Sequence, residues 1–355
     1  MSESIEEIAR AVERAARGGL DRVGALRNVV PVDSSRRFYS SGARLRLVFD
    51  HAALDVYVKV YRRQGRGFES ECVGWAREES SLLHGVHALS GSEGEPSVVR
   101  PLWLLAEIPA VVFEFHHGEP LSNRLRPRRP RFGMAPDCLR TTQALFSEAG
   151  RHLRAFHEMT GPEGSGRPLV ERLEPIEQPL DAVIESTDQM AARMARLCRP
   201  RLAPALLDLH VHAKRAFQER VTDRYPRNGV HGDFTPVNVF VDSGKTTLFD
   251  FVNFHLGHPY EDLGRFLAYT LFLRKNPLLF RSVDVSALCS AFLDGYGLTD
   301  RVSDPELVFF FQRSLFRTIG GGLRFQERSW PLNMVYARAM RRVLDSWISA
   351  GGGLP

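Results

Sequence analysis

Three polar residues stand close together in the segment HGDFTPVNVF, residues 231–240: His231, Asp233 and Asn238. The segment otherwise has the pattern of a turn that leads into a strand. An aspartate can accept the proton of a hydroxyl group, and an amide oxygen can hold a divalent cation. A loop aspartate, a turn asparagine and a core histidine would explain a lone triplet equally well, so the rest of the chain must decide.

A second acid follows in the segment NVFVDSGKTTLFDF, residues 238–251, which predicts a β-hairpin around DSGK. With Gly244 at the centre of the turn, Asn238 and Asp250 lie equally far from it and directly opposite each other. Directly opposed residues of an antiparallel pair have Cβ atoms about 5 Å apart. The amide and the carboxylate can therefore share one cation, and Mg²⁺ favours such oxygen ligands together with substrate phosphates.

Lysine is scarce in this chain, which makes Lys59 notable among only four lysines. It lies in VYVKVY, residues 56–61, where valines alternate with tyrosine and lysine, and this alternation predicts a strand with the lysine on its polar face. The upstream run RLRLVF, residues 44–49, is joined to it by DHAALD and predicts the antiparallel partner strand. A solvated lysine on an exposed sheet face is the alternative interpretation.

The segments after Lys59 predict a helix and a further strand. ECVGWAREESSLLHGVHAL, residues 71–89, predicts a helix that carries Glu78 and Glu79, and AVVFEFHHGEPL predicts a strand that ends at Gly118. A strand lysine held by a helix glutamate can reach the phosphates of a nucleoside triphosphate, as in the nucleotide-binding lobe of protein kinases. We favour Glu79 as the partner because apolar residues follow it at helical spacing, with Glu78 as the alternative.

From Lys59 to about Thr270 the chain resembles the aminoglycoside phosphotransferase and choline kinase family, small-molecule kinases with a protein-kinase-like fold. In the family's order, the similar segments are VYVKVY, VVFEFHHGEPL, EAGRHLRAFHEM, HGDFTPVNVFVD, LFDFVNF and GHPYEDLGRFLAY. The resemblance implies an α+β fold of two lobes. Residues 1–115 would form a nucleotide-binding lobe with an antiparallel sheet and a helix, preceded by the amphipathic N-terminal helix that the helical spacing of Ile5, Ile8 and Val12 predicts. Residues 116–355 would form a larger, mainly helical lobe for catalysis and acceptor binding.

The resemblance also implies roles for individual residues. Lys59 would bind the α and β phosphates of ATP or GTP, and Asp233, in the H-x-D-x-x-x-x-N spacing of a kinase catalytic loop, would be the base or would position the acceptor hydroxyl. Asn238 and Asp250 would be Mg²⁺ ligands. Further implied contributions come from backbone groups near Glu114 and Phe115, which would bind the adenine, and from His231 and Asp262, which would brace the loop.

The chain departs from the kinase pattern in two places. No glycine-rich phosphate loop precedes the first hairpin, and the candidate segment is VDSSRRFYSSGARL, residues 32–45, whose serines could contact phosphates: Ser34, Ser35, Ser40 and Ser41. After Asp250 comes FVNF, without the glycine of a protein-kinase activation segment, which argues against a protein kinase. A regulatory pseudokinase is a further alternative, but such proteins usually lack the lysine, the base or a metal ligand, and this chain has all of them.

The remaining helical segments should form the acceptor pocket, and TIGGGLRFQERSW, residues 318–330, predicts a loop between the last two helices. A polycationic aminoglycoside would require clustered acids. The C-terminal tail instead has three arginines, Arg338, Arg341 and Arg342, against the single Asp345. We therefore favour a neutral or anionic hydroxylated metabolite as acceptor, with aminoglycosides as the alternative. Choline would require an aromatic cage, for which only Trp330 and Tyr336 are available.

The composition predicts a globular chain of enzyme size, with 355 residues, 43% hydrophobic and 25% charged residues. The acidic N-terminal segment and the lack of a long apolar stretch predict a cytoplasmic protein, and the four cysteines have no CxxC spacing.

The net charge of +5 comes mostly from arginine and is weak evidence for nucleic acid. The run RLRPRRPR, residues 124–131, could contact an anionic membrane, but its prolines favour a solvated loop. We expect a monomer or homodimer without nucleic-acid or membrane contact; a membrane-surface or nucleic-acid binding module is the alternative.

Overall fold

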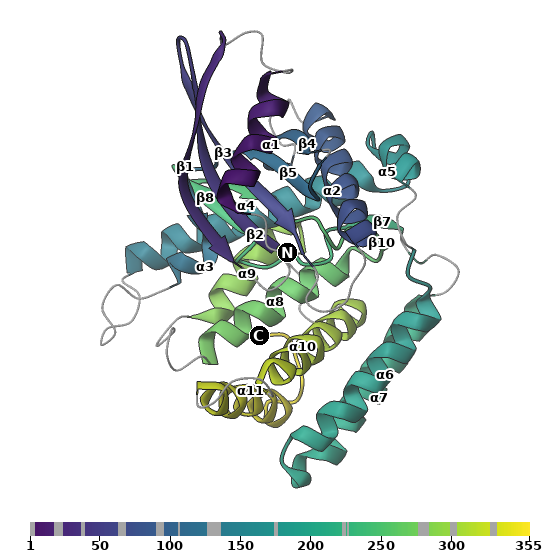
Figure 1. The fold of residues 1–355 in the computed structure, drawn as a ribbon. Coiled ribbons are helices and arrows are strands. Elements are labelled where there is room, and N and C mark those ends of the chain that lie inside the picture. The colour runs from purple at the N-terminus through teal and green to yellow at the C-terminus, as the bar shows by residue number, and fades with distance from the viewer. Residues whose placement is uncertain are drawn as a thin grey trace.

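The computed structural model describes residues 4–17, 24–36, 40–62, 69–89, 96–105, 107–125, 136–173, 177–221, 225, 227–275, 284–298, 304–326 and 332–355. The chain folds into a small lobe built on an antiparallel sheet and a larger lobe that is mainly helical (Figure 1). This is the predicted α+β architecture of a protein-kinase-like fold. In these ranges no helix has both the length and the apolar character needed to cross a membrane.

The small lobe contains a five-stranded antiparallel sheet in the order β1-β2-β3-β5-β4. Its strands are β1 (Leu26–Arg36), β2 (Ser40–Phe49), β3 (Ala53–Tyr61), β4 (Pro101–Leu105) and β5 (Ala110–Glu114). The predicted pair β2–β3 and strand β5 are confirmed. The sequence did not predict β1, because this edge strand leaves Val30 and Val32 exposed and contains Pro31, so it lacks the alternation of a half-buried strand. The candidate phosphate segment 32–45 consists largely of β1 and β2, and its residues 37–39 lie outside the described ranges.

Two helices cover opposite faces of this sheet. Helix α1 (Ile5–Arg17) buries Ile8 and Val12 in a core that includes the three alternating valines of β3, Val56, Val58 and Val60. Helix α2 (Glu69–Leu89) packs on the other face, where Tyr57 and Tyr61 contact the larger core of the molecule. The alternation along β3 therefore places Lys59 on the α2 face, as its sequence pattern predicted.

The larger lobe begins with β6 (Glu119–Pro120) and α3 (Leu121–Arg124). The elements that follow are α4 (Pro136–Thr160), α5 (Arg167–Leu173), α6 (Leu180–Leu197), η1 (Pro200–Leu202), α7 (Ala203–Arg220), β7 (Asn228–Val230), β8 (Val239–Asp242), β9 (Lys245–Leu248), β10 (His255–Gly257), α8 (Tyr260–Lys275), α9 (Val285–Tyr296), α10 (Pro305–Gln326) and α11 (Leu332–Ser349). Strands β6, β8 and β9 form one small antiparallel sheet, and β7 pairs with β10.

The loop predicted at residues 318–330 is wrong for residues 318–326. Helix α10 includes these residues and continues through the three glycines of the segment to Gln326. Phe316 and Ile319 are fully buried just before them, so packing of the helix overrides the low helical propensity of glycine. Residues 327–330, with Trp330, lie outside the described ranges, as do the side chain of Tyr336 and most of the arginine-rich run 124–131.

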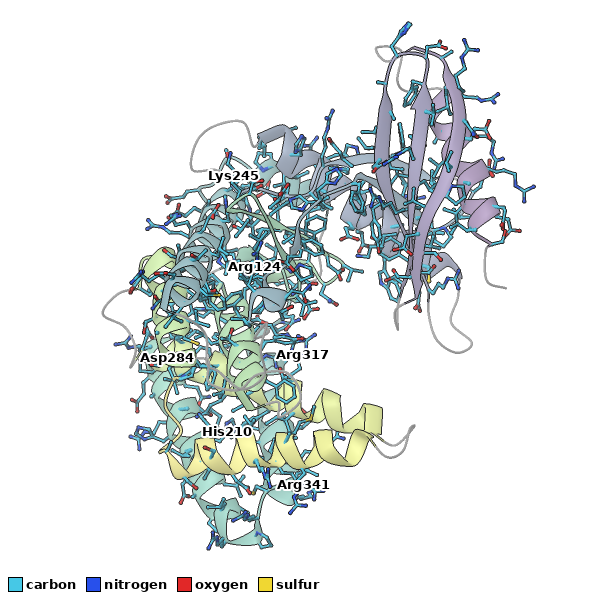
Figure 2. The ribbon with its side chains drawn as sticks, turned by 90° about the vertical axis from the view of Figure 1, so that its left-hand side faces the viewer. Arg124, His210, Lys245, Asp284, Arg317 and Arg341 are labelled. Carbon is cyan, nitrogen blue, oxygen red and sulfur yellow. The ribbon has the colours of Figure 1, made fainter. Side chains whose placement is uncertain are left out.

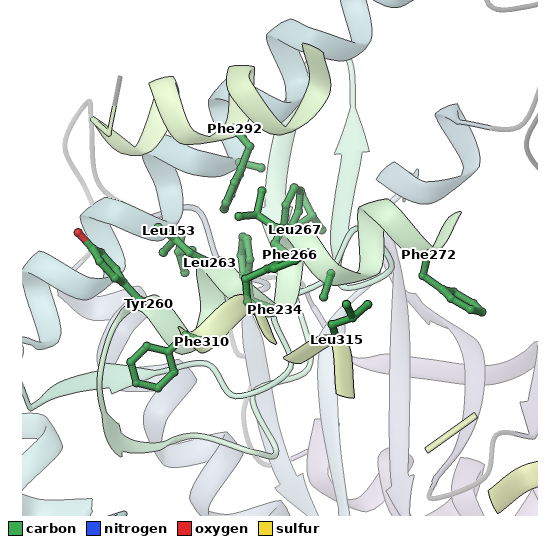
Figure 3. Close-up of a cluster of buried hydrophobic side chains, with 14 of the residues drawn as sticks. Leu153, Phe234, Tyr260, Leu263, Phe266, Leu267, Phe272, Phe292, Phe310 and Leu315 are labelled. Atoms are coloured by element: carbon green, nitrogen blue, oxygen red, sulfur yellow. The ribbon is translucent and has the colours of Figure 1, made fainter. Parts of the chain in front are cut away.

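An aromatic cluster anchors the loop 231–238 to the helices beneath it (Figure 3). Phe234 of this loop is fully buried, and its ring centroid lies 5.3 Å from that of Phe266 on α8 and 6.1 Å from that of Phe292 on α9. Phe266 and Phe292 stack on each other at 4.0 Å. Aromatic pairs at such distances contribute about 0.5–1.5 kcal/mol each beyond the area they bury. The position of Asp233, next to Phe234, is therefore tied to the core.

Helices α4 and α9 cross so closely that two glycines are required at the contact. A Cβ atom on Gly150 would lie 2.2 Å from the carbonyl oxygen of Phe292, and one on Gly295 would lie 1.9 Å from the carbonyl oxygen of Ser147. No side chain fits at either position without separating the helices. This crossing brings His157 of α4 and Tyr296 of α9 together in the buried network described below.

We expect Gly150→Ala to lower the free energy of unfolding by about 1–3 kcal/mol, because its methyl group overlaps the backbone of α9. The matched control is Gly74→Ala in α2, where a Cβ would meet nothing within 4 Å. The control should raise the free energy of unfolding by about 1 kcal/mol, since alanine is the better helix former. Urea unfolding of both variants checks this, and equal effects would contradict the close crossing.

Candidate functional site

A cavity of about 210 Å³ lies between the sheet of the small lobe and the β8–β9 hairpin of the larger one. It is lined by Ser35, Ser40, Tyr57, Lys59, Glu79, Val99, Phe113, Glu114, Phe115, His116, Gly118, Asn238, Phe240, Phe249 and Asp250. Of the residues that the sequence nominated for binding and catalysis, these line it: Ser35, Ser40, Lys59, Glu79, Glu114, Phe115, Asn238 and Asp250. Among the nominated serines, Ser34 and Ser41 do not line it. Asp233 does not line it either, but it contacts Asn238 directly. Segments from both lobes thus meet at one hollow with apolar walls and charged groups at one end.

The ammonium group of Lys59 is held between two carboxylates. Its Nζ donates hydrogen bonds to Glu79 Oε2 at 2.8 Å and to Asp250 Oδ1 at 2.6 Å. Glu79 also accepts the amide of Phe251 at 2.7 Å and the hydroxyl of Tyr61. Of the two candidate glutamates, Glu79 therefore makes the contact, while Glu78 is exposed.

The charge on Lys59 is secured by these neighbours. Burial acts to lower the pKa of the Lys59 ammonium, but attraction by Asp250 and by Glu79 outweighs burial and raises it above its ordinary value. Lys59 is therefore a fixed positive charge inside the cavity. Since Asp250 is 29% exposed and Glu79 only 1%, the side of the group facing Asp250 is the one open to a ligand.

The loop that carries Asp233 is held by the buried carboxylate of Asp262 on α8. Asp262 is fully buried and accepts the amides of His231 at 2.7 Å and Gly232 at 2.9 Å, and it contacts His157 Nε2 at 3.0 Å. Burial alone would raise the pKa of Asp262, but its interactions with His157 and His231 hold it below its ordinary value. The imidazole of His231 contacts the carbonyl of Phe249 at 2.9 Å and so joins the loop to the hairpin.

Asp233 is positioned by one neighbour on each of its carboxylate oxygens. The Nδ2 group of Asn238 donates to the Asp233 carbonyl oxygen at 2.9 Å and to Oδ2 at 3.3 Å. Arg265 of α8 donates to Oδ1 through Nη2 at 2.8 Å and Nε at 3.1 Å. Because the amino end of the Asn238 amide is used in this way, its oxygen is the end left for a cation.

The predicted register of the β8–β9 hairpin is wrong by one residue. Val239 pairs with Leu248, and the Phe249 amide donates to the carbonyl of Asn238, so Asn238 lies opposite Phe249 and not opposite Asp250. The reason is a two-residue turn, Ser243–Gly244, in which both residues have positive φ. Asp250 lies just beyond the strand and has a φ of 68°. This left-handed conformation bends the chain there, and Asp250 still lines the cavity with Asn238.

The connection between the lobes provides the apolar end of the cavity. The amides of Glu114 and Phe115 already donate to the carbonyls of Arg100 and Asp55, each at 3.0 Å. These two amides are therefore used within the protein. The guanidinium of Arg44 lies 3.9 Å above the Phe115 ring and fixes its orientation.

Sequence reasoning missed Arg265 as a site residue, although the segment that contains it was singled out. No local signal reveals the contact, because Arg265 and Asp233 are 32 positions apart and meet only through the packing of α8 beneath the loop. Arg265 also donates to Thr318 of α10 at 3.0 Å, which links the loop to that helix.

The comparisons with known proteins agree with this geometry. Residues 55–299 match the family described as "Phosphotransferase enzyme family". The match includes all the candidate site residues except the serines Ser34, Ser35, Ser40 and Ser41. No curated protein sequence matches the chain.

Several solved structures share the fold. A choline kinase from Cryptosporidium parvum is 10% identical with a TM-score of 0.53, and 98% of each chain is covered. An ethanolamine kinase from Plasmodium vivax is 14% identical with a TM-score of 0.52, covering 87% of this chain and 81% of that one. A choline/ethanolamine kinase family protein from Mesorhizobium loti is 14% identical with a TM-score of 0.52, covering 97% of both. At these identities the likeness shows the fold alone.

We expect Glu79→Gln to lower the free energy of unfolding by about 2 kcal/mol, because Lys59 loses a charged acceptor in a buried site. Glu78→Gln is the matched control on the same helix and should change stability by less than about 0.5 kcal/mol. Guanidinium unfolding measures both. A Glu79 variant as stable as the Glu78 variant would argue against the buried pair.

We expect Asp262→Asn to lower the free energy of unfolding at pH 7 by about 2–3 kcal/mol, because one of the donors around the carboxylate loses its acceptor. The folded pKa of Asp262 lies below its ordinary value of 3.8, so its stabilisation is present above pH 3.8 and is lost as the pH falls through the folded pKa. The difference between wild type and variant should shrink on acidification below pH 3.8. A difference that stays constant from pH 7 to pH 2.5 would contradict an ionised Asp262.

Proposed function

The chain belongs to the phosphotransferase enzyme family, and from this premise we propose that it transfers the γ-phosphoryl group of ATP or GTP to a hydroxyl group of a small metabolite. The observation that carries the proposal is the arrangement of fixed charges along the cleft. Lys59 and Asp250 meet at the cavity, Asn238 lines the same cavity, and Asn238 also holds Asp233. A phosphate group and a hydroxyl group could therefore approach each other between Lys59 and Asp233.

The nucleotide would fill the cavity with its base at the lobe connection. Val99, Phe113, Phe240 and Phe249 provide apolar surface for a planar ring. Backbone groups near Glu114 and Phe115, which line this end of the cavity, would bind the adenine, as the resemblance to the family implied. Phosphates would extend toward Lys59, with the serines Ser35 and Ser40 at the rim, where no glycine-rich loop is present.

The residues at the charged end fit Mg²⁺. Asn238 and Asp250 provide an amide oxygen and a carboxylate, the oxygen ligands that Mg²⁺ uses together with substrate phosphates. Across the described ranges no group of three or more His, Cys, Asp or Glu residues could hold a metal ion, so a metal here would depend on the nucleotide for its remaining ligands. When bound, Mg²⁺ would neutralise phosphate charge.

Asp233 would act on the acceptor. Its carboxylate is 29% exposed and is held in place through both oxygens, so it can meet the acceptor hydroxyl without rearranging. In the transfer, the hydroxyl oxygen forms a bond to the γ-phosphorus, the bond from that phosphorus to the bridging oxygen breaks, and the nucleoside diphosphate leaves. The hydroxyl proton passes to Asp233, late in the step, when the oxygen has become acidic.

The acceptor that we favour is a neutral or anionic hydroxylated metabolite rather than an aminoglycoside. Three arginines of α11, Arg338, Arg341 and Arg342, are exposed, and the single acid in the sequence of that helix, Asp345, is paired with Arg199. A surface of this kind repels a polycation. We retain aminoglycoside phosphorylation and a regulatory, nucleotide-binding role without transfer as the alternatives that the test below separates.

We expect Asp233→Asn to lower the rate of transfer by about 10²–10⁴-fold while nucleotide affinity stays within about twofold, because the base is lost and the nucleotide contacts remain. Asp242→Asn is the control, since Asp242 is exposed at the end of β8 and outside the cavity. The purified chain would be incubated with Mg²⁺, ATP or GTP and a pooled library of hydroxylated metabolites and aminoglycosides. Mass spectrometry would detect gains of one phosphoryl group, and calorimetry would measure nucleotide binding.

A product formed by wild type and by Asp242→Asn but not by Asp233→Asn identifies the acceptor and supports the role of Asp233. Equal loss of transfer and of nucleotide binding in Asp233→Asn would contradict that role. Nucleotide binding with no product from any pool would favour the regulatory alternative.

A further inference from the structure

Three arginines gather on the side of Asp233 that faces α10. Arg265 of α8 and two arginines of α10, Arg313 and Arg317, line one small hollow together with Gly232, the residue before Asp233. Arg313 and Arg317 are four residues apart and therefore lie on one face of their helix. Figure 2 labels Arg317, which is exposed. Arg265 binds Oδ1 of Asp233 and Asn238 binds Oδ2, so these arginines lie on the side of the carboxylate that faces away from Asn238 and the nucleotide cavity.

These arginines differ in what they contact. Arg265 is bound to Asp233 and Thr318. Arg313 contacts only neutral groups among the described residues, with Nη1 2.8 Å from Ser186 Oγ and Nη2 3.3 Å from Gln178 Oε1. The side chain of Arg317 makes neither a hydrogen bond nor an ion pair with any of the described residues. Among the described residues, the guanidinium groups of Arg313 and Arg317 on this side of Asp233 thus have no hydrogen-bonded carboxylate partner.

The acids near this hollow do not supply the missing partner. Asp262 is fully buried and already accepts the amides of the loop. Glu261 is directed toward His255, with Oε2 3.6 Å from its Nε2. Asp233 uses Oδ1 for Arg265.

The pKa of Arg317 is affected by the two other arginines of the hollow, Arg265 and Arg313. Burial among protein atoms lowers the pKa of the Arg317 guanidinium, and repulsion by Arg265 and Arg313 lowers it further, while Asp233 and Glu261 act in the opposite direction. An anion at this position would relieve the repulsion. The hollow itself has a volume of only about 10 Å³, too small for more than one water molecule, so an anion would bind outside it, on the exposed side chain of Arg317.

We propose that the acceptor is a hydroxylated organic anion whose phosphate or carboxylate group binds Arg317, with Arg313 adding positive charge, while its hydroxyl group meets Asp233. The planar fork of a guanidinium suits both groups, because it can donate two parallel hydrogen bonds to either. This inference rests on the proposed function and narrows its acceptor to one class. An acceptor that carries only amines would be repelled by these arginines.

The first test measures anion binding with inorganic sulfate as the probe. The full chain is saturated with Mg²⁺ and a non-hydrolysable ATP analogue, so that sulfate cannot occupy the phosphate position near Lys59, and radioactive sulfate is followed by equilibrium dialysis. Arg317→Gln should bind sulfate at least tenfold more weakly than wild type. Arg215→Gln is the control, since Arg215 is an exposed α7 residue paired with Glu219, and it should bind within about twofold of wild type. Equal binding by wild type and Arg317→Gln, or no binding by wild type, would overturn the proposal.

The second test compares acceptors that differ in one charged group: glycerol with glycerol 3-phosphate, and glucose with glucuronate, glucose 6-phosphate and glucosamine. We expect kcat/KM to be at least tenfold higher for the anionic compounds, and this preference should be lost in Arg317→Gln. The phosphate and carboxylate compounds show which anion is used. Preference for neutral or amine compounds would overturn the anionic class and leave the proposed function intact. If the nucleotide does not bind at all, the proposed function fails, and sulfate binding by the two arginine variants still decides whether the anion site exists.

Discussion

The candidate site depends on one buried charge, the carboxylate of Asp262. It is enclosed by helices and accepts the amides of His231 and Gly232, so the loop that carries Asp233 begins from a fixed point. A buried carboxylate is stable only when its oxygens are satisfied, and His157 completes the set. His157 is in turn bound to Tyr296, 2.9 Å away, across the α4–α9 crossing that Gly150 and Gly295 make possible. The close packing of two helices is thus connected to the orientation of Asp233 through three hydrogen-bonding side chains.

The cleft combines charges that would be costly to bury alone. Lys59 is 11% exposed and lies between Glu79 and Asp250, and Asp233 lies between Asn238 and Arg265. Each charge has an opposite partner inside the protein, but Asp250 and Asp233 are also each 29% exposed. The buried partners hold the groups in place, and the exposed oxygens are the ones that a metal, a phosphate or a hydroxyl could reach. This division of roles suits phosphoryl transfer, in which positioning and charge neutralisation do most of the work.

The sequence predicted the elements whose patterns are local. The alternation in VYVKVY placed Lys59 on the correct face of β3, and helices were predicted at the N-terminus, from the spacing of Ile5, Ile8 and Val12, and at residues 71–89. Prediction from the sequence failed where tertiary contacts decide the local structure. Edge strand β1 has no buried face to reveal it, the glycines of α10 are helical because their helix is packed, and the β8–β9 register depended on the length of the turn. Arg265 was missed because no pattern in the sequence connects it to Asp233. The family match agrees with the overall interpretation, whereas the roles of Lys59, Asp233, Asn238 and Asp250 remain proposals that their geometry supports.

The central claim is that the cleft between Lys59 and Asp233 holds a nucleoside triphosphate together with its metal ion. The most direct measurement replaces Mg²⁺ by Mn²⁺ and follows its electron paramagnetic resonance in the presence of ATP, for wild type, Asp250→Asn and the control Asp242→Asn. The account predicts that Mn²⁺ and ATP enhance each other's binding to wild type and to the control, and that Asp250→Asn weakens the bound metal signal at least tenfold. Metal binding that is independent of ATP, or unchanged in Asp250→Asn, would contradict it.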